Sequence, residues 1–304
     1  MTSAVESIGE VVNSIEMKVQ ASGAVHIAGT IPALFESTLL NPWRRKRIHK
    51  AQISPMSQNI DNLEVAAANA CTTLTSDVAH VWIFSRRHYL SECEEMSRLI
   101  SSIENVRAAS FRAEGHRRDF IIARALLRVI VGGYCGCHPH EMQFEYGARG
   151  KPVLTRKSRR SAHIEFNMSH SGDAVLIAVS QDAEVGADIE EVGSATVYSD
   201  AIASTCINAQ EAPTFAGLTG MDRSLMLLRY WIHKEAYLKA TGCGLSHDAQ
   251  DLTVTFLDCR RSTIQQTYEP GQQRLFGHDV RCGRNFIGAI VCSARIRTLK
   301  YFKI

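Results

Sequence analysis

The chain has 304 residues, of which 45% are hydrophobic and 21% charged, and a formal net charge of +3. These values are typical of a globular protein that can bury a large core in one domain or two smaller ones. The weak positive charge does not by itself indicate a nucleic-acid-binding protein.

The cysteine pattern and the first residues of the chain indicate in which cellular compartment the protein resides. Nine cysteines are scattered without a disulfide framework, which favours a reducing environment. No apolar run reaches transmembrane length, and the first residues carry acids instead of the basic start of a signal peptide. We therefore expect a cytoplasmic protein.

Residues 1–77 differ from the rest of the chain. Clusters of Ser, Asn, Ala and Thr surround a basic run, "NPWRRKRIHK" (41–50). Such a run could contact nucleic acid or an acidic partner, but a solvated, mobile tail is the interpretation we favour. We predict an extension over residues 1–77, a first half over 78–184 and a second half over 185–304.

The first half contains strand-like and helix-like patterns. The apolar run 80–84 predicts a strand. Residues 90–103 predict an amphipathic helix with Ser91 as its N-cap. Apolar residues recur at helical spacing over 117–134, which predicts a long helix ending at a Gly pair. Two strand-like runs over 163–180 surround the turn "SHSGD".

The second half begins with the strand-like segment "VGADIEEV" (185–192). A polar helical region precedes a long predicted helix over 225–241, which a glycine ends. Strands are predicted over 251–256 and 285–296. Both halves therefore place helix before a final apolar hairpin, and we predict an α+β fold of two related halves.

Two carboxylates and a helix stripe mark a candidate site. Asp188 and Glu190 are two residues apart in a predicted strand, so they share one face. Trp231, Glu235 and Lys239 follow at intervals of four residues, so they form one stripe on a helix. Taken alone, Glu235 and Lys239 could simply form a surface ion pair.

Three carboxylates close together require a cation. Mg²⁺ accepts a few carboxylate oxygens, retains waters and commonly completes its shell with a substrate phosphate. Groups suited to phosphate lie in "GARGKP", which contains Arg149 and Lys151, and in "NMSHSG", which contains Ser169 and His170. An ordinary turn histidine is an equally good interpretation of His170.

The motifs "GKP", "FNMSHSGD", "VGADIE" and "WIHKEAYLKATGCGL" occur in this order. Over roughly residues 80–292 the chain resembles the 4′-phosphopantetheinyl transferases of the surfactin-synthetase type, while residues 1–77 have no counterpart. The resemblance implies a pseudo-dimer of two similar α+β halves. It also implies Mg²⁺-dependent transfer of 4′-phosphopantetheine from coenzyme A to a serine of an apo acyl or peptidyl carrier protein. We expect a monomer that binds neither nucleic acid nor membrane.

The resemblance also assigns roles to residues. It implies the metal ligands Asp188, Glu190 and Glu235, the pyrophosphate-binding Lys239, and the nucleotide-binding Lys151, Ser169 and His170. Arg124 either adds a phosphate contact or takes part in packing or a surface pair. The base that accepts the serine proton is Glu235 or Glu211, and Glu211 could equally be a solvated helix acid.

Two further motifs and two other functions remain open. "CGCHPH" (135–140) has the composition of a metal cluster but lacks the usual zinc spacing, which favours a turn. "RKSRRSAH" (156–163) is a basic loop that could meet an acidic carrier protein or a phosphate. The alternatives to a transferase are a Mg²⁺-dependent phosphohydrolase, which shares the carboxylates, and a non-enzymatic nucleic-acid-binding module.

Overall fold

The computed structural model describes residues 60–147, 150–156, 158, 163–193, 200–243, 249–267 and 274–303. These residues belong to one compact unit that extends over residues 45–304. The α-helices are α2 (Ile60–Cys71), α3 (Cys93–Ser97), α4 (Ser102–Ala109), α5 (Glu114–Cys135), α6 (Asp200–Cys206), α7 (Ala212–Ala216) and α8 (Gly220–Thr241). The first strands are β1 (Val78–Ser85), β2 (Phe144–Tyr146), β3 (Pro152–Leu154), β4 (Ile164–Ser171), β5 (Ala174–Gln181) and β6 (Val185–Glu191). The later strands are β7 (Leu252–Phe256), β8 (Arg261–Gln266), β9 (Leu275–Arg281), β10 (Phe286–Cys292) and β11 (Thr298–Lys303).

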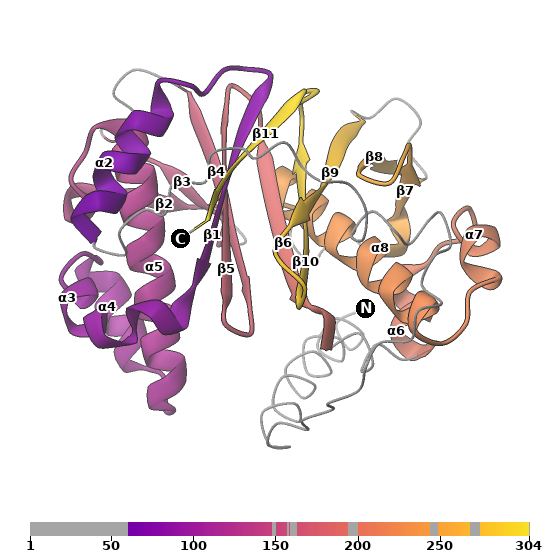
Figure 1. Ribbon diagram of the computed structural model, residues 1–304, viewed down its shortest axis with the longest axis horizontal. Helices are drawn as coiled ribbons and strands as arrows, with labels where there is room; N and C mark the ends of the chain where they lie inside the picture. The colour runs from indigo at the N-terminus through magenta and orange to yellow at the C-terminus, as the bar shows by residue number, and fades with distance from the viewer. Residues whose placement is uncertain are drawn as a thin grey trace. The chain divides into compact units, whose positions relative to one another are not determined.

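Within the described residues the strands form two main sheets and a small ribbon of β2 and β3. One sheet has four strands in the order β11-β1-β5-β4, and the other has five in the order β6-β10-β9-β8-β7. Figure 1 shows α2 to α5 beside the four-stranded sheet and α8 beside the five-stranded one. The predicted α+β class with two helix-and-sheet halves is confirmed.

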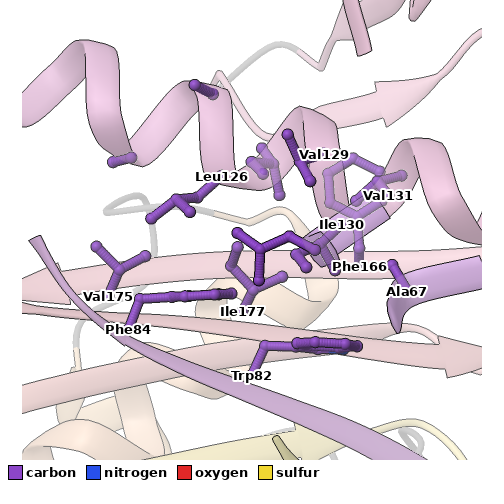
Figure 2. Close-up of a cluster of buried hydrophobic side chains, with 14 of the residues drawn as sticks. Ala67, Trp82, Phe84, Leu126, Val129, Ile130, Val131, Phe166, Val175 and Ile177 are labelled. Atoms are coloured by element: carbon purple, nitrogen blue, oxygen red, sulfur yellow. The ribbon is translucent and has the colours of Figure 1, made fainter. Parts of the chain in front are cut away.

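The first core lies between α5 and the four-stranded sheet. Leu126 and Ile130 of α5 are fully buried, as are Trp82 and Ile177 of the sheet. Figure 2 shows these apolar side chains facing one another across the layer. Because each such side chain contributes about 1.5–3 kcal/mol when buried, this face accounts for much of the stability of the first half.

The helix predicted over 117–134 is confirmed, but it does not end at its Gly pair. α5 continues through Gly133 and ends at Gly136, which adopts a left-handed conformation with φ of 62°. Gly133 instead serves packing, since a Cβ there would lie 2.5 Å from Cβ of Ala67 in α2. The glycine therefore lets two helices approach closely, a role that a sequence pattern does not distinguish from a helix stop.

The predicted extension over residues 1–77 is wrong for its last part. Residues 60–71 form α2, and Leu63 and Ala67 of this helix are fully buried against the first core. The basic run 41–50 lies outside the described residues. The first half therefore begins at least as early as residue 60, because α2 covers a face of α5 that would otherwise be exposed.

A second correction concerns the helix predicted over 90–103. Ser91 lies in a 3₁₀ segment over Arg86–Glu92, and α3 begins only at Cys93. The real capping box is ten residues later, where Ser101 and Glu104 cap each other at the start of α4. Both serines are followed three residues later by glutamate, so the local pattern alone did not distinguish them.

The C-terminal strand also departs from the predicted division into halves. β11 pairs in parallel with β1, with Val78 opposite Thr298 and Ile83 opposite Lys303. Residues 298–303 therefore complete the sheet of the first half. The predicted second half over 185–304 is too long at its end, because pairing between strands so distant in sequence leaves no local signal.

Candidate active site

The strand β6 lies directly on the helix α8. A Cβ at Gly186 would overlap the carbonyl oxygen of Ala236 and the backbone nitrogen of Ala240. Because side chains alternate along a strand, Asp188 and Glu190 are on the same face as Gly186 and are therefore turned toward α8. The intervening Ala187 and Ile189 pack into the apolar layer between the two sheets. Gly186 thus brings the two carboxylates to the helix.

Asp188 is almost completely buried and is held by two side chains. Ser169 Oγ of β4 donates to Asp188 Oδ1 at 2.8 Å, and Lys239 Nζ donates to the same oxygen at 2.6 Å. Lys239 Nζ also donates to Ser169 Oγ at 3.1 Å. Asp188 Oδ2 is buried and has no hydrogen-bond partner. One oxygen of this carboxylate is therefore satisfied while the other is not.

Glu190 accepts a hydrogen bond from a second serine of β4, Ser171. Ser171 Oγ lies 2.8 Å from Glu190 Oε2, and the backbone N–H of Glu191 donates to Ser171 Oγ at 3.3 Å. Since a hydroxyl has one hydrogen and already accepts from a backbone N–H, that hydrogen is directed at Glu190. Ser169 and Ser171, two residues apart on β4, each hold one of the two β6 carboxylates that face α8.

Glu235 is on α8, one helical turn before Lys239. Desolvation, followed by the charge of Asp188, raises the pKa of Glu235 to about 7, although Lys239 lowers it. Burial by itself lowers the pKa of Lys239. The negative charges of Asp188 and Glu235 raise that pKa by more, so the net shift is upward and the ammonium remains protonated. Near neutral pH, Glu235 can therefore either accept or release a proton.

The alternative of a simple helix-surface pair between Glu235 and Lys239 does not describe this site. Within the described part of the chain, the ion pair that Lys239 makes is with Asp188, across the contact between helix and sheet. The Asp188 side chain is only 4% exposed, so the pair neutralises a charge that burial would otherwise make costly.

The residue types fit a divalent metal, but their arrangement is not that of an assembled metal site. Among the described residues, no three His, Cys, Asp or Glu side chains are placed to hold a metal ion. Asp188, Glu190 and Glu235 offer the hard oxygen donors that Mg²⁺ prefers, and Asp188 Oδ2 is buried without a partner. In this structure the ammonium of Lys239 provides the positive charge beside Asp188.

His170 and Lys151 lie at the edge of this group. The His170 side chain is solvent-exposed, yet desolvation by the surrounding protein and the charges of Arg86 and Lys239 lower its pKa. Lys151 Nζ donates to the carbonyl oxygen of Ala240 at 2.7 Å, and desolvation lowers its pKa. Lys151 therefore holds the last turn of α8, and its neighbour Arg149 lies outside the described residues.

Arg124 does not join the site. Its Nε donates to Glu104 Oε1 at 2.6 Å and its Nη2 donates to Tyr146 Oη at 2.9 Å. Arg128 Nε binds the other oxygen of Glu104, at 2.6 Å, so the three side chains form a buried network. In this structure Arg124 takes the alternative role in packing, and its phosphate contact stays a prediction.

Glu211 is also placed elsewhere, and its surroundings do not support its predicted role as the base. It is 2% exposed, and its Oε2 accepts from Lys234 Nζ at 2.6 Å. Its Oε1 accepts from the backbone N–H of Val254 at 2.8 Å. Desolvation raises the pKa of Glu211, while Lys234 opposes the shift. A carboxylate enclosed in this way joins α8 to β7 and has no access to a substrate proton.

Two family models match the chain. One, described as 4′-phosphopantetheinyl transferase, N-terminal, matches residues 87–182, and the other, described as the 4′-phosphopantetheinyl transferase superfamily, matches residues 184–291. The chain is 36% identical to 4′-phosphopantetheinyl transferase HetI of Nostoc sp. strain PCC 7120 over 174 residues, which cover 57% of this chain and 73% of that relative. The chain belongs to the 4′-phosphopantetheinyl transferases.

Two further relatives show lower identity to the chain. 4′-Phosphopantetheinyl transferase psf-1 of Bacillus pumilus is 29% identical over 174 residues, covering 57% of this chain and 71% of the relative. Human L-aminoadipate-semialdehyde dehydrogenase-phosphopantetheinyl transferase is 26% identical over 208 residues, covering 64% of this chain and 65% of the relative. This membership decides in favour of a transferase over the two alternative functions.

Sequence reasoning missed two residues of the transferase site. Asn167 Oδ1 accepts from the backbone N–H of Ala187 at 3.1 Å, so it joins β4 to β6, and Ser171 holds Glu190. The signal was present, because Asn167, Ser169 and Ser171 alternate with other residues along one strand. Three polar side chains on one strand face predict a polar contact, though not with which strand.

Other predicted features lie apart from this site or outside the described residues. The "CGCHPH" segment follows the end of α5 and includes a short 3₁₀ turn over Pro139–Glu141. Most of the basic loop 156–163 is not described. Among the helices that the structure describes, none combines the length and apolar character needed to cross a bilayer.

Proposed function

We propose that this transferase moves 4′-phosphopantetheine from coenzyme A to a serine of an apo acyl or peptidyl carrier protein, with Mg²⁺, and releases adenosine 3′,5′-bisphosphate. The observation that carries the proposal is the convergence of three groups where β6 meets α8. Lys239 Nζ lies 2.6 Å from Asp188 Oδ1, and desolvation together with the charge of Asp188 raises the pKa of Glu235 to about 7. A buried carboxylate, a base active near neutral pH and a cation suit phosphoryl transfer.

The proposal assigns the metal to Asp188, Glu190 and Glu235. A Mg²⁺ ion held by these residues would supply positive charge to the pyrophosphate of coenzyme A. Support comes from the oxygen donors themselves and from the buried, unpartnered Asp188 Oδ2. Ser169 and Ser171 orient two of the three carboxylates through their hydroxyl hydrogen bonds.

Glu235 is the base in this proposal, since Glu211 is enclosed in the protein. The hydroxyl oxygen of the carrier serine forms a bond to the β-phosphorus, and its proton passes to Glu235. The bond between that phosphorus and the bridging oxygen breaks, and its electron pair remains on the departing bisphosphate. In the metal-free structure the pKa of Glu235 is about 7, so the carboxyl group is about half ionised near neutral pH and can accept the proton.

Lys239 binds the pyrophosphate and stabilises the departing oxygen in this proposal, because its ammonium lies 2.6 Å from Asp188 Oδ1. Ser169 and His170, near the end of β4, bind the nucleotide. Lys151 has a weaker claim to this role, because its ammonium binds the carbonyl oxygen of Ala240.

We also propose that the enzyme is of the surfactin-synthetase-activating type, which the ordered motifs between residues 150 and 245 support. A panel of purified apo carriers from fatty-acid, polyketide and nonribosomal-peptide systems tests this assignment. The monomeric state and the cytoplasmic location remain predictions, and size-exclusion chromatography tests the first of them.

The test of the function is a transfer reaction followed by intact-protein mass spectrometry. The enzyme is incubated with coenzyme A, Mg²⁺ and an apo carrier, with the serine-to-alanine carrier as the matched control. We expect the carrier to gain the mass of phosphopantetheine only when its serine is present, and a chelator to stop the gain. Release of inorganic phosphate without any mass gain would instead support a phosphohydrolase.

A further inference from the structure

We propose that Lys239 holds Asp188 as a substitute for the metal, and that binding of metal and of coenzyme A is coupled because both require this contact to break. The inference rests on the proposed function, which places metal at Asp188 and pyrophosphate at Lys239. Lys239 Nζ lies 2.6 Å from Asp188 Oδ1 and 3.1 Å from Ser169 Oγ. Metal at Asp188 and pyrophosphate at Lys239 cannot both be bound while Lys239 and Asp188 remain in contact.

The contact explains why the carboxylates are not assembled around a metal position. The side chain of Asp188 is 4% exposed, so its negative charge needs a nearby cation even when no metal is bound. Lys239 provides that cation from α8. A divalent cation at the same carboxylate would be repelled by the ammonium, so Lys239 and metal compete for Asp188.

The structure also shows why Lys239 can leave. Its side chain is 32% exposed and extends from the last turn of α8 on a flexible four-carbon stem. Lys234 on the same helix is different, because it is fully buried and bonded to both Glu211 and the carbonyl oxygen of Cys206. Lys234 is fixed in the fold, whereas Lys239 can turn toward solvent or a bound anion.

Asp188 is prepared for the exchange. When Lys239 leaves, Ser169 Oγ still donates to Asp188 Oδ1, so the carboxylate keeps its orientation. Asp188 Oδ2 is buried and has no hydrogen-bond partner in the described structure, so a ligand that reaches it would satisfy an acceptor that is otherwise unpaired. A pyrophosphate that draws Lys239 away therefore raises the affinity for metal, and by thermodynamic linkage the metal raises the affinity for coenzyme A to the same degree.

The test is Mn²⁺ binding, measured by calorimetry or by the loss of the free-ion electron paramagnetic resonance signal. The variants are Lys239→Met and Lys239→Gln, with Lys300→Met on β11 as a matched loss of positive charge in the other sheet. Without coenzyme A, we expect both Lys239 variants to bind Mn²⁺ roughly tenfold more tightly than the wild type. Coenzyme A should tighten Mn²⁺ binding more in the wild type than in either variant, and Lys300→Met should match the wild type.

A misfolded variant would not gain affinity, so tighter binding identifies the exchange. Unchanged or weaker Mn²⁺ binding by both Lys239 variants, with their circular dichroism spectra unchanged and wild-type transfer intact, would overturn the exchange and leave the proposed function standing. If the wild type binds no Mn²⁺ even with coenzyme A and transfers nothing, both proposals are wrong.

Discussion

Mutations in the helix α2 test whether this segment belongs to the core or to a solvated tail. Leu63 is fully buried against the first core, whereas Val65, two residues along the same helix, is 60% exposed. Leu63→Ala removes most of a buried side chain, and such changes typically cost about 2–5 kcal/mol. Val65→Ala changes a solvent-facing side chain and should stay within about 0.5 kcal/mol.

These free energies translate into melting temperatures. For a domain of this size, 1 kcal/mol corresponds to about 2–4 °C, so a loss of roughly 3 kcal/mol lowers the melting temperature by about 6–12 °C. Thermal melts followed by circular dichroism measure the difference, with Val65→Ala as the control on the same helix. A chain that begins at Thr75 loses all of α2, and we expect it to be insoluble or far less stable.

Equal melting temperatures for the two variants would refute the placement of α2 in the core. Soluble, fully active protein from a chain beginning at Thr75 would do the same. Either result would restore the simpler interpretation of residues 60–71 as part of a solvated tail.

Three further predictions concern the site and its surroundings. Lys239→Ala should lower kcat by roughly a hundredfold and also lower the melting temperature, because it leaves the buried charge of Asp188 without its cation. Unchanged kcat in steady-state kinetics would remove the lysine from catalysis. Ser171→Ala should weaken transfer at low Mg²⁺ and recover at high Mg²⁺, whereas Thr75→Ala, which loses a similar 2.8 Å bond to Asp77, should not change the Mg²⁺ requirement. Burial holds the pKa of His233 at about 4, below the 6.5 of an exposed histidine, so the unfolded chain is protonated first as pH falls. Stability should therefore fall between pH 6.5 and 4 by roughly 3 kcal/mol from this group, and urea melts of His233→Gln should show a smaller loss.

The elements with strong local patterns could be predicted from the sequence. Helical periodicity gave most of α5 and α8, and the alternating runs around Gly172 gave β4 and β5. Asp188 and Glu190 do share one face of a strand, as their spacing predicts. In each case the residues that decide the structure lie within a few positions of one another.

The features that sequence reasoning missed depend on distant partners. The alanine-rich α2 resembles a linker until Gly133 of α5 is placed against Ala67. β11 has no local feature that indicates its pairing with β1. Lys239 is four residues from Glu235, the spacing of a helix pair, yet it binds Asp188 on another element because burial makes that charge the more costly one to leave alone.

Two charged residues were predicted to belong to the site, but the fold places them elsewhere. Arg124 and Glu211 have the right chemistry and suitable positions in the motif order, but each is engaged by a buried partner, Glu104 and Lys234 respectively. A motif fixes residue types and spacing, whereas the availability of a side chain depends on what the fold places beside it.

The central claim is that the group around Asp188 carries out phosphopantetheine transfer. The most direct measurement compares wild type and Asp188→Asn by mass spectrometry of an apo carrier after incubation with coenzyme A and Mg²⁺, with equal melting temperatures as a check on folding. We predict that the wild type adds phosphopantetheine to the carrier serine and that Asp188→Asn, which keeps the shape but loses the charge beside Lys239, adds almost none. Transfer by Asp188→Asn at the wild-type rate would contradict the account.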